Sequence, residues 1–241
     1  MLGNIKGTFL SKKKLSFDIY EFTFLCKEPS EINFLPGQYL IIIFSKDNEI
    51  KRKYYSISSP LRQSDSIEFI VKILKNGLGS NYLMNLKEGD IVELQGPAGL
   101  FFLKENDKQK VLIATGTGIA PMISIIKTHV EDMKNKFNLI WGLKKSEDIY
   151  YRDLLRDTAQ KYDNFSYEIF LSKEESIDNS NDSTFSGRIN IGIDKLLNNF
   201  KTNKESLEFY ISGDRDIVDS IRTYLIEKQI LPENIKLEKF I

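Results

Sequence analysis

The chain is 241 residues long, with 41% hydrophobic and 28% charged residues, which is ordinary for a globular protein and long enough for two domains. Lysine plus arginine and aspartate plus glutamate number 34 each, so no net charge points to nucleic acid as a partner. The single cysteine, Cys26, excludes an intrachain disulfide and any cysteine-ligated iron–sulfur or zinc site built from this chain alone, and no metal site is expected.

The histidine content and the apolar runs argue against two further classes. The single histidine, His129, leaves little material for a nucleophile–histidine hydrolase, and we expect it to be structural or exposed. The start of the chain lacks the basic residues and long apolar run of a signal peptide. The longest strongly apolar stretch, residues 39–44, is too short to span a bilayer. We therefore expect a cytoplasmic protein without a membrane span.

The first hundred residues predict short strands separated by turns. Apolar and polar residues mostly alternate from Ile67 to Ile73, which is typical of a half-buried strand. Cys26 lies among apolar residues and is expected as a buried thiol in a strand. Turn-forming pairs such as Pro36-Gly37 and Gly96-Pro97 separate the strands, and this spacing indicates a small antiparallel β-barrel. The expected strands are residues 17–19, 22–24, 39–43, 67–73 and 91–94.

The barrel sequence also contains a candidate phosphate site. A short helix is expected from Ser80 to Lys87, with Ser80 as its N-cap, and the glycine-rich residues 77–80 lead into it, so their amides can face an anion. The cationic residues 51–53 adjoin the aromatic and hydroxyl side chains of residues 54–59. This combination fits a planar, phosphorylated ligand, although it is equally compatible with the exposed surface of a strand.

From residue 107 onward the pattern changes to alternating strands and helices. Residues 111–114 form a continuous apolar run, which is typical of a strand buried on both faces. The alternation predicts an α/β domain with a doubly wound parallel sheet, and the polar residues 173–186 are expected to form a surface loop. The expected strands are residues 111–114, 137–141, 167–171, 207–211 and 235–240, and the expected helices are 120–134, 149–161, 193–199 and 214–228.

A second candidate phosphate site follows the buried strand. Gly116 and Gly118 allow a sharp turn and a close approach to a ligand, and Pro121 suits the first turn of the next helix. Such a helix start offers free amides to a pyrophosphate. Pro121 stands where the ordinary dinucleotide fingerprint has its third glycine, and no acid ends the next strand, at Trp141. A tight structural turn is the alternative.

Six motifs in the order of the chain make the sequence similar to the ferredoxin–NADP reductase-like flavoenzymes. The resemblance runs from about residue 5 to the C-terminus and implies a flavin-binding β-barrel domain (residues 1–105) followed by a nicotinamide-dinucleotide-binding α/β domain (residues 106–241). The motifs are Phe34-Leu35-Pro36-Gly37-Gln38-Tyr39, Lys53-Tyr54-Tyr55-Ser56, Gly77-Leu78-Gly79-Ser80, Gly96-Pro97-Ala98-Gly99, Gly116-Thr117-Gly118-Ile119-Ala120-Pro121 and Tyr210-Ile211-Ser212-Gly213-Asp214.

The resemblance implies roles for barrel residues. Tyr55, which follows Tyr54, would pack against the isoalloxazine ring, and Ser56 would hydrogen-bond near flavin N5. The arginine of the family is replaced by Lys53, with Arg52 adjacent, and a lysine lacks the bidentate fork of an arginine. The flavin pyrophosphate would be bound at the helix start, by Gly77, Gly79 and Ser80.

The resemblance also implies roles in the second domain. Ser212 stands where the family usually has a cysteine beside the nicotinamide. Glu238 would be an acid near the active site, and Phe240 would be the ring that covers the flavin and moves aside; a closing strand with a buried phenylalanine is the alternative. The nicotinamide dinucleotide would be held by Thr115, Gly116, Thr117, Gly118, Pro121, Gly213 and Asp214.

The residues after the third strand of this domain bear on the choice of nucleotide. Some NADPH-using relatives place Ser-Arg there for the 2′-phosphate, and this chain has Ser172 and Lys173. Arg215 or Arg222 could assist. A basic residue without an acid at this position favours NADPH slightly over NADH.

The resemblance therefore implies an enzyme that passes a hydride between NAD(P)H and bound FAD, with FMN the less expected flavin. Flavin and nicotinamide carry out this chemistry themselves, which suits a chain poor in histidine and cysteine. Electrons would pass to a small acidic carrier such as ferredoxin or flavodoxin. The alternatives are a reductase that releases free reduced flavin, and a subunit that serves a larger multicomponent enzyme. The expected docking residues are Lys12, Lys13, Lys14, Lys72 and Lys75.

Overall fold

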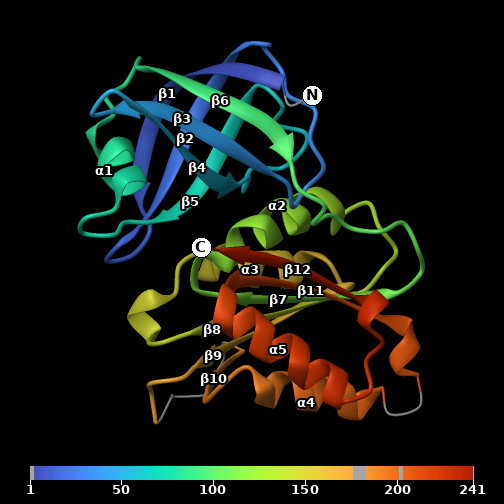
Figure 1. Ribbon diagram of the computed structural model, residues 1–241. Helices are drawn as coiled ribbons and strands as arrows, with labels where there is room; N and C mark the ends of the chain where they lie inside the picture. Colours follow the sequence, from blue (N-terminus) through green and yellow to red (C-terminus); the bar gives the residue numbers. More distant parts are fainter. Residues whose placement is uncertain (1–2, 176–182, 201–202, 241) are drawn as a thin grey trace. The chain divides into compact units, whose positions relative to one another are not determined.

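The computed structural model describes residues 3–175, 183–200 and 203–240 (Figure 1). Contacts divide the chain into two compact units, Met1–Leu103 with Ala120–Thr128, and Lys104–Ile119 with His129–Ile241. No helix in the described ranges has both the length and the apolar character needed to cross a bilayer.

The first unit is built on a six-stranded antiparallel sheet with the order β4-β3-β6-β1-β2-β5. Beyond the end of β4, Ile57 bridges to Phe69 in β5, and the Ser58 N–H donates to the Glu68 carbonyl at 2.9 Å. The two edges of the sheet therefore meet, and the predicted antiparallel barrel is confirmed. The strands are β1 (Gly3–Lys14), β2 (Ile19–Glu28), β3 (Tyr39–Lys46), β4 (Glu49–Ser56), β5 (Ser66–Lys72) and β6 (Ile91–Ala98).

The barrel core explains the strand pattern. Phe22 and Phe24 in β2 and Phe69 in β5 are completely buried, because alternate residues of these strands point inward. Cys26 is buried in β2, as expected, and burial raises the pKa of its thiol to about 11. Phe17, expected in a strand, instead lies in the β1–β2 turn and is 85% exposed. Strand β1, which lacks a clear apolar alternation, was not expected, and β4 was expected only as the alternative to a ligand site at residues 51–59.

Two helical segments lie in the first unit, and the second of them belongs to it only from Ala120 to Thr128. Helix α1 (Leu78–Asn85) begins two residues earlier than expected, after Gly77 at the N-cap position. Ser80 is not the N-cap, because its hydroxyl accepts a hydrogen bond from the Leu74 N–H at 2.9 Å. In helix α2 (Ile119–His129), the Ser124 hydroxyl donates to the Ser59 carbonyl at 2.7 Å.

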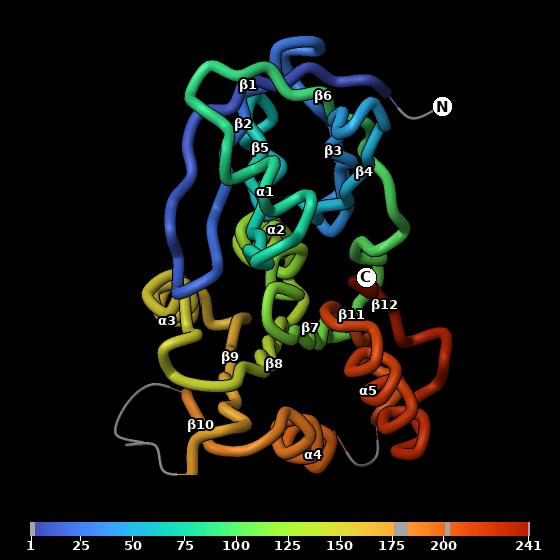
Figure 2. Tube along the Cα trace, turned by 60° about the vertical axis from the view of Figure 1, so that its left-hand side comes forward, coloured from blue at the N-terminus to red at the C-terminus, as the bar shows by residue number. Residues whose placement is uncertain are grey.

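The second unit is a six-stranded parallel sheet with the order β10-β9-β8-β7-β11-β12, which confirms the predicted doubly wound domain. Helices α4 and α5 pack on one face through Val111 and Ile113 of β7, and α3 packs against β9 on the other face (Figure 2). The strands are β7 (Gln109–Thr115), β8 (Phe137–Leu143), β9 (Phe165–Leu171), β10 (Thr184–Ser186), β11 (Leu207–Asp214) and β12 (Ile235–Phe240), and the helices are α3 (Arg152–Lys161), α4 (Asn190–Asn199) and α5 (Arg215–Glu227).

Several element boundaries differ from those expected. Helix α2 ends at His129 rather than residue 134, and the Asn164 amide donates to the Val130, Met133 and Asn135 carbonyls of the turn that follows. Helix α3 starts at Arg152 because Tyr151 before it adopts the left-handed conformation, with φ 59°. Residues 184–186 of the expected loop form β10, while residues 176–182 lie outside the described ranges.

Candidate functional site

The first unit contains a cluster where β4 passes the first turn of α1. A Cβ atom built on Gly79 would overlap the Tyr55 hydroxyl and lie 3.0 Å from Lys53 Cγ. Only glycine allows this close approach of the helix start to the strand. The structure therefore brings together Lys53 and Gly79, which were expected at the flavin phosphates, and Tyr55, which was expected against the flavin ring.

The cation next to Lys53 lies elsewhere. Successive residues of a strand point to opposite faces, so Arg52 shares its face with Tyr54 rather than with Lys53 and Tyr55. Tyr54 is 59% exposed and meets the Tyr39 ring edge to face, with centroids 5.6 Å apart. Arg52 and Tyr54 are therefore not part of the cluster at Gly79.

The start of α1 is free of side-chain caps. Gly77 has no side chain to offer, and the Ser80 hydroxyl is already bound to its own loop. The first N–H groups of a helix have no intrahelical acceptor, so they can bind an anion. Burial raises the pKa of Tyr55 to about 12, which keeps its hydroxyl protonated and able to donate. Ser56, at the end of β4, is buried.

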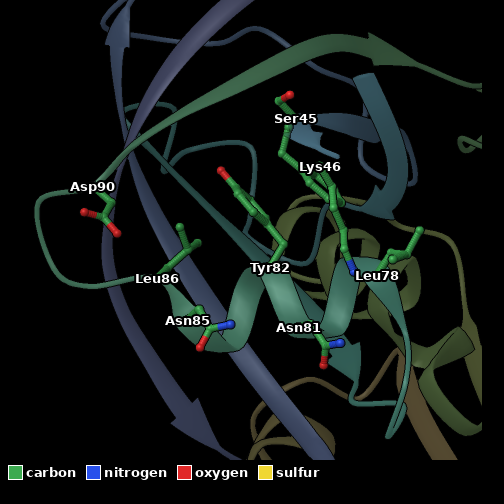
Figure 3. A pocket seen from close by; sticks show the side chains of 9 residues that line it. Ser45, Lys46, Leu78, Asn81, Tyr82, Asn85, Leu86 and Asp90 are labelled. Atoms are coloured by element: carbon green, nitrogen blue, oxygen red, sulfur yellow. The ribbon is translucent and has the colours of Figure 1, made fainter. Parts of the chain in front are cut away.

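A pocket of about 500 Å³ lies between α1 and the end of β3 (Figure 3). Its apolar wall includes Phe44 and Tyr82, whose rings stack with centroids 4.3 Å apart. Lys46 extends toward Leu78 in the first turn of α1, and both residues line the pocket. Lys46 was not expected at a site, since nothing in the sequence places the end of β3 next to α1. The remaining lining residues are Ser45, Asn81, Asn85, Leu86 and Asp90.

In the second unit, β7 ends at Thr115 and a 3-10 turn, Gly116–Gly118, leads into α2. A Cβ atom built on Gly118 would overlap the Ser212 carbonyl oxygen and lie 2.7 Å from Gly213 Cα. The turn therefore rests directly on the carboxyl end of β11, the neighbouring strand. This places Thr115, the glycine turn, Ser212 and Gly213, which were all expected at the dinucleotide site, in one group.

Two hydroxyls of this group are buried without a hydrogen-bond partner among the described residues, Thr115 Oγ1 and Ser212 Oγ. Ser212 is completely buried. Buried polar groups in native proteins nearly always have a partner. Unpaired hydroxyls at the carboxyl ends of adjacent parallel strands fit a polar ligand at this edge of the sheet.

Two aromatic side chains that sequence analysis missed hold the same turn. The Trp141 indole N–H donates to the Gly116 carbonyl at 3.0 Å, and the Tyr150 hydroxyl donates to the same oxygen at 3.4 Å. Trp141 is near the end of β8, which pairs with β7. In a doubly wound sheet, residues at the ends of neighbouring strands lie side by side, and this rule could have identified Trp141.

The flanking residues have mainly structural contacts. The Asp214 carboxylate caps α5, accepting hydrogen bonds from the Asp216 N–H at 3.1 Å and the Ile217 N–H at 3.4 Å. Pro121 is buried in the first turn of α2. No group of three or more histidine, cysteine, aspartate or glutamate side chains in the described part of the chain could hold a metal ion.

The C-terminal strand lines up with Ser212. In the β11–β12 register, Ser212 pairs with Glu238 and Asp214 pairs with Phe240. Burial raises the pKa of the Glu238 carboxyl to about 7. Near neutral pH this carboxyl can therefore both hold and release a proton.

The candidate 2′-phosphate residues follow β9. The Ser172 hydroxyl donates to the Leu143 carbonyl at 3.2 Å, whereas Lys173 is exposed. The next residue, Glu174, was missed, and its carboxylate accepts hydrogen bonds from the Ser146 N–H and hydroxyl at 2.6 and 2.8 Å, which lower its pKa. Arg215 and Arg222 are on α5, which follows β11, three strands away from β9, so the structure does not place them with Lys173.

Comparison with known families covers both units. A family model described as "Oxidoreductase FAD-binding domain" matches residues 6–103, and one described as "Oxidoreductase NAD-binding domain" matches residues 112–223. The two matches follow each other in the same order as the barrel and the parallel sheet.

A curated relative and two solved structures extend this comparison. The chain is 29% identical over 213 residues to the toluate 1,2-dioxygenase electron transfer component of Pseudomonas putida, covering 88% of this chain. It spans 59% to 62% of the length of this and two further relatives. An Amycolatopsis cytochrome P450 reductase has a TM-score of 0.86 at 22% identity, over 99% of this chain and 70% of that one. A ferredoxin NADP+ reductase from Neisseria gonorrhoeae has a TM-score of 0.81 at 21% identity, over 98% of both chains. At these identities the two structures show a common fold.

Proposed function

Because the chain belongs to the ferredoxin–NADP reductase-like flavoenzymes, in which an FAD-binding domain precedes an NAD-binding domain, we propose that it moves electrons from NAD(P)H through bound FAD to a small acidic carrier protein. It is an NAD(P)H-dependent flavoprotein reductase. The observation that carries the proposal is that each unit has a glycine at a close approach beside a helix start, Gly79 in the first unit and Gly118 in the second. When bound, the flavin and the nicotinamide supply the hydride and electron chemistry.

Residues 1–105 hold the flavin in this proposal. The uncapped amides of α1 and the ammonium group of Lys53 bind its diphosphate, since both are donors to an anion and Gly79 lets them approach each other. Tyr55 packs against the ring system and keeps its proton for donation, and Ser56 offers a hydroxyl at the end of β4.

The pocket beside α1 accommodates the adenosine half of FAD. It starts at Leu78, next to the proposed phosphate site, and has a stacked aromatic wall and amide side chains that can bind a base and a ribose (Figure 3). Lys46 supplies a second cation near the same helix start. FMN lacks this half of the molecule, so the pocket favours FAD.

Residues 106–241 hold the nicotinamide dinucleotide. The turn at residues 116–118 binds its pyrophosphate through backbone amides, and the unpaired Thr115 and Ser212 hydroxyls gain partners. Ser212 and Gly213 position the nicotinamide. Glu238 holds or releases a proton at its carboxyl, and Phe240 covers the flavin ring until the nicotinamide displaces it.

NADPH is the proposed nucleotide, through Lys173. Its exposed ammonium group can bind a 2′-phosphate. Glu174, which could instead favour the 2′-hydroxyl of NADH, already accepts two hydrogen bonds from Ser146. The Ser172 hydroxyl must leave the Leu143 carbonyl to contribute.

The carrier docks on the basic β1–β2 hairpin and the end of β5. Lys13, Lys14 and Lys75 are exposed, and Lys14 lies 5.8 Å from the centre of the exposed Phe17 ring. Lys72 pairs with Asp18 at 3.3 Å and Lys12 donates to the Met84 carbonyl, so these two also shape the hairpin. A positive surface with an apolar tip suits an acidic protein partner. The curated relative's description as an electron transfer component favours a protein acceptor.

Purification and rapid reduction test the proposal. We expect yellow protein that keeps its colour through gel filtration, flavin bleaching by NADPH faster than by NADH, and reoxidation by a ferredoxin or flavodoxin. Release of the flavin during gel filtration, with free FAD or FMN turned over as substrate, would instead show a flavin reductase. Colourless protein without affinity for flavins or pyridine nucleotides would exclude the whole scheme.

A further inference from the structure

The carbonyl oxygen of Gly116 accepts hydrogen bonds from two aromatic side chains that are distant in the sequence. Trp141 in β8 is completely buried and donates its indole N–H at 3.0 Å, and Tyr150, before α3, donates its hydroxyl at 3.4 Å. The two rings meet edge to face, with centroids 5.0 Å apart and an interplanar angle of 80°. This edge-to-face contact fixes the two donors relative to each other.

Peptide geometry gives these contacts a consequence on the other side of the turn. A trans peptide is planar, and its C=O and N–H groups point in opposite directions. Holding the Gly116 oxygen toward Trp141 therefore turns the Thr117 N–H away from the aromatic pair. Gly116 has φ 52°, a left-handed conformation, and a Cβ atom built there would meet no atom within 4 Å, so this part of the turn borders open space.

We infer that Trp141 and Tyr150 are positioning residues for the dinucleotide, because they preset the Gly116–Thr117 peptide so that its N–H faces the pyrophosphate. The inference rests on the proposed function, since it requires the nucleotide to bind at this turn. Without the two donors, the peptide can rotate, and the nucleotide must order it on binding. The lost preorganisation weakens binding and leaves the bound arrangement unchanged.

Two shape-preserving changes remove the donors. Tyr150→Phe deletes the hydroxyl, and replacement of Trp141 by β-(3-benzothienyl)alanine exchanges the indole N–H for sulfur at nearly the same size. We expect the Kd for NAD+ and NADP+, measured by calorimetry on the flavin-loaded protein, to rise about 3-fold for Tyr150→Phe and about 5-fold for the Trp141 replacement, from the usual net strength of a hydrogen bond. Tyr167→Phe, on β9, is the matched control and should leave both Kd values unchanged.

A second readout separates positioning from mere support of the core. We expect the KM for NAD(P)H to rise with the Kd, while kcat at saturating nucleotide and the Kd for flavin stay at their wild-type values. Trp141 is the sole tryptophan of the chain, so nucleotide binding should also change the intrinsic fluorescence of the wild-type and Tyr150→Phe proteins. Equal loss of nucleotide affinity and flavin affinity would show a structural role and overturn the inference.

The outcomes also distinguish this inference from the proposed function. If the wild-type protein binds neither nucleotide, the proposed function fails. If the wild-type protein binds a nucleotide and both donor-deleting variants bind it as tightly, the proposed function stands and the role of Trp141 and Tyr150 is excluded.

Discussion

The two glycine turns of the molecule, residues 77–80 in the first unit and 116–118 in the second, are stabilised in different ways. The first lies against the Lys53 side chain and shares a pocket boundary with Lys46, so two lysine side chains border it. The described contacts of the second turn are to backbone, hydroxyl and aromatic groups. Charge gives strong binding of a phosphate, whereas neutral donors bind it more weakly. The difference suits a flavin that stays bound and a nucleotide that must leave in each turnover.

Gly118→Ala should have the largest effect, because it disables the second turn and leaves the first turn intact. The new methyl group would overlap the Ser212 carbonyl oxygen, and overpacking of this kind costs about 3 kcal/mol. We expect the Kd for NADP+ to rise about 100-fold, measured by calorimetry. The flavin content should remain that of the wild type.

Gly116→Ala provides the graded control. Position 116 has open space around it, so the cost is limited to the left-handed backbone, about 1 kcal/mol. Its effect on nucleotide affinity should be clearly smaller than that of Gly118→Ala. If Gly116→Ala weakens nucleotide binding more than Gly118→Ala does, the close contact with β11 does not determine the conformation of the turn.

Lys53→Gln tests the charged turn. Loss of a charge-assisted contact to a phosphate should raise the Kd for FAD and FMN about 10-fold, measured by flavin fluorescence, and reduce the salt dependence of flavin binding. Arg52→Gln is the matched control, since it removes the same charge from the other face of β4. Equal effects of the two variants would show that flavin binding depends on the total positive charge of β4 and not on a contact from Lys53.

The different fates of Arg52 and Lys53 show how far the sequence could predict the site. Both glycine turns can be recognised in the sequence, because a turn between a strand and a helix is local in the chain. Strand alternation could also have separated Arg52 from Lys53, but β4 lacks the apolar pattern that would have identified it as a strand. Trp141, Tyr150 and Lys46 reach the turns through strand pairing and packing, which no local pattern encodes.

Glu238→Gln tests whether the carboxyl of Glu238, in the C-terminal strand of the second unit, is held neutral. The pKa of Glu238 is raised to about 7 by burial, so the folded protein retains a proton that the unfolded chain releases near pH 4.5. The free energy of unfolding should therefore fall by about 1–2 kcal/mol as the pH rises from 4.5 to 7, after allowance for partial exposure. Chemical denaturation at several pH values should show this slope in the wild type and a flatter profile in Glu238→Gln. If the free energy of unfolding has the same pH dependence in the wild type and in Glu238→Gln, the carboxyl is not held neutral.

Lys46→Gln tests which part of the flavin cofactor Lys46 contacts. If the pocket beside α1 takes the adenosine half of FAD, Lys46 contacts the outer part of the cofactor only. The Kd for FAD should rise about 5-fold, and the Kd for FMN should stay constant. A parallel loss for both flavins would place Lys46 at the phosphate that they share and leave the pocket without a role in choosing FAD.

Lys173→Gln tests the proposed contact between a charged side chain of the second unit and the 2′-phosphate of NADPH. Lys173 is exposed, so its contact to a 2′-phosphate is screened by solvent and contributes modestly. We expect the KM for NADPH to rise about 3-fold while the KM for NADH, which lacks that phosphate, stays the same. NADH thus serves as the control within the same variant. If neither KM changes, the second unit binds its nucleotide through neutral groups alone, and the contrast between the two units becomes complete.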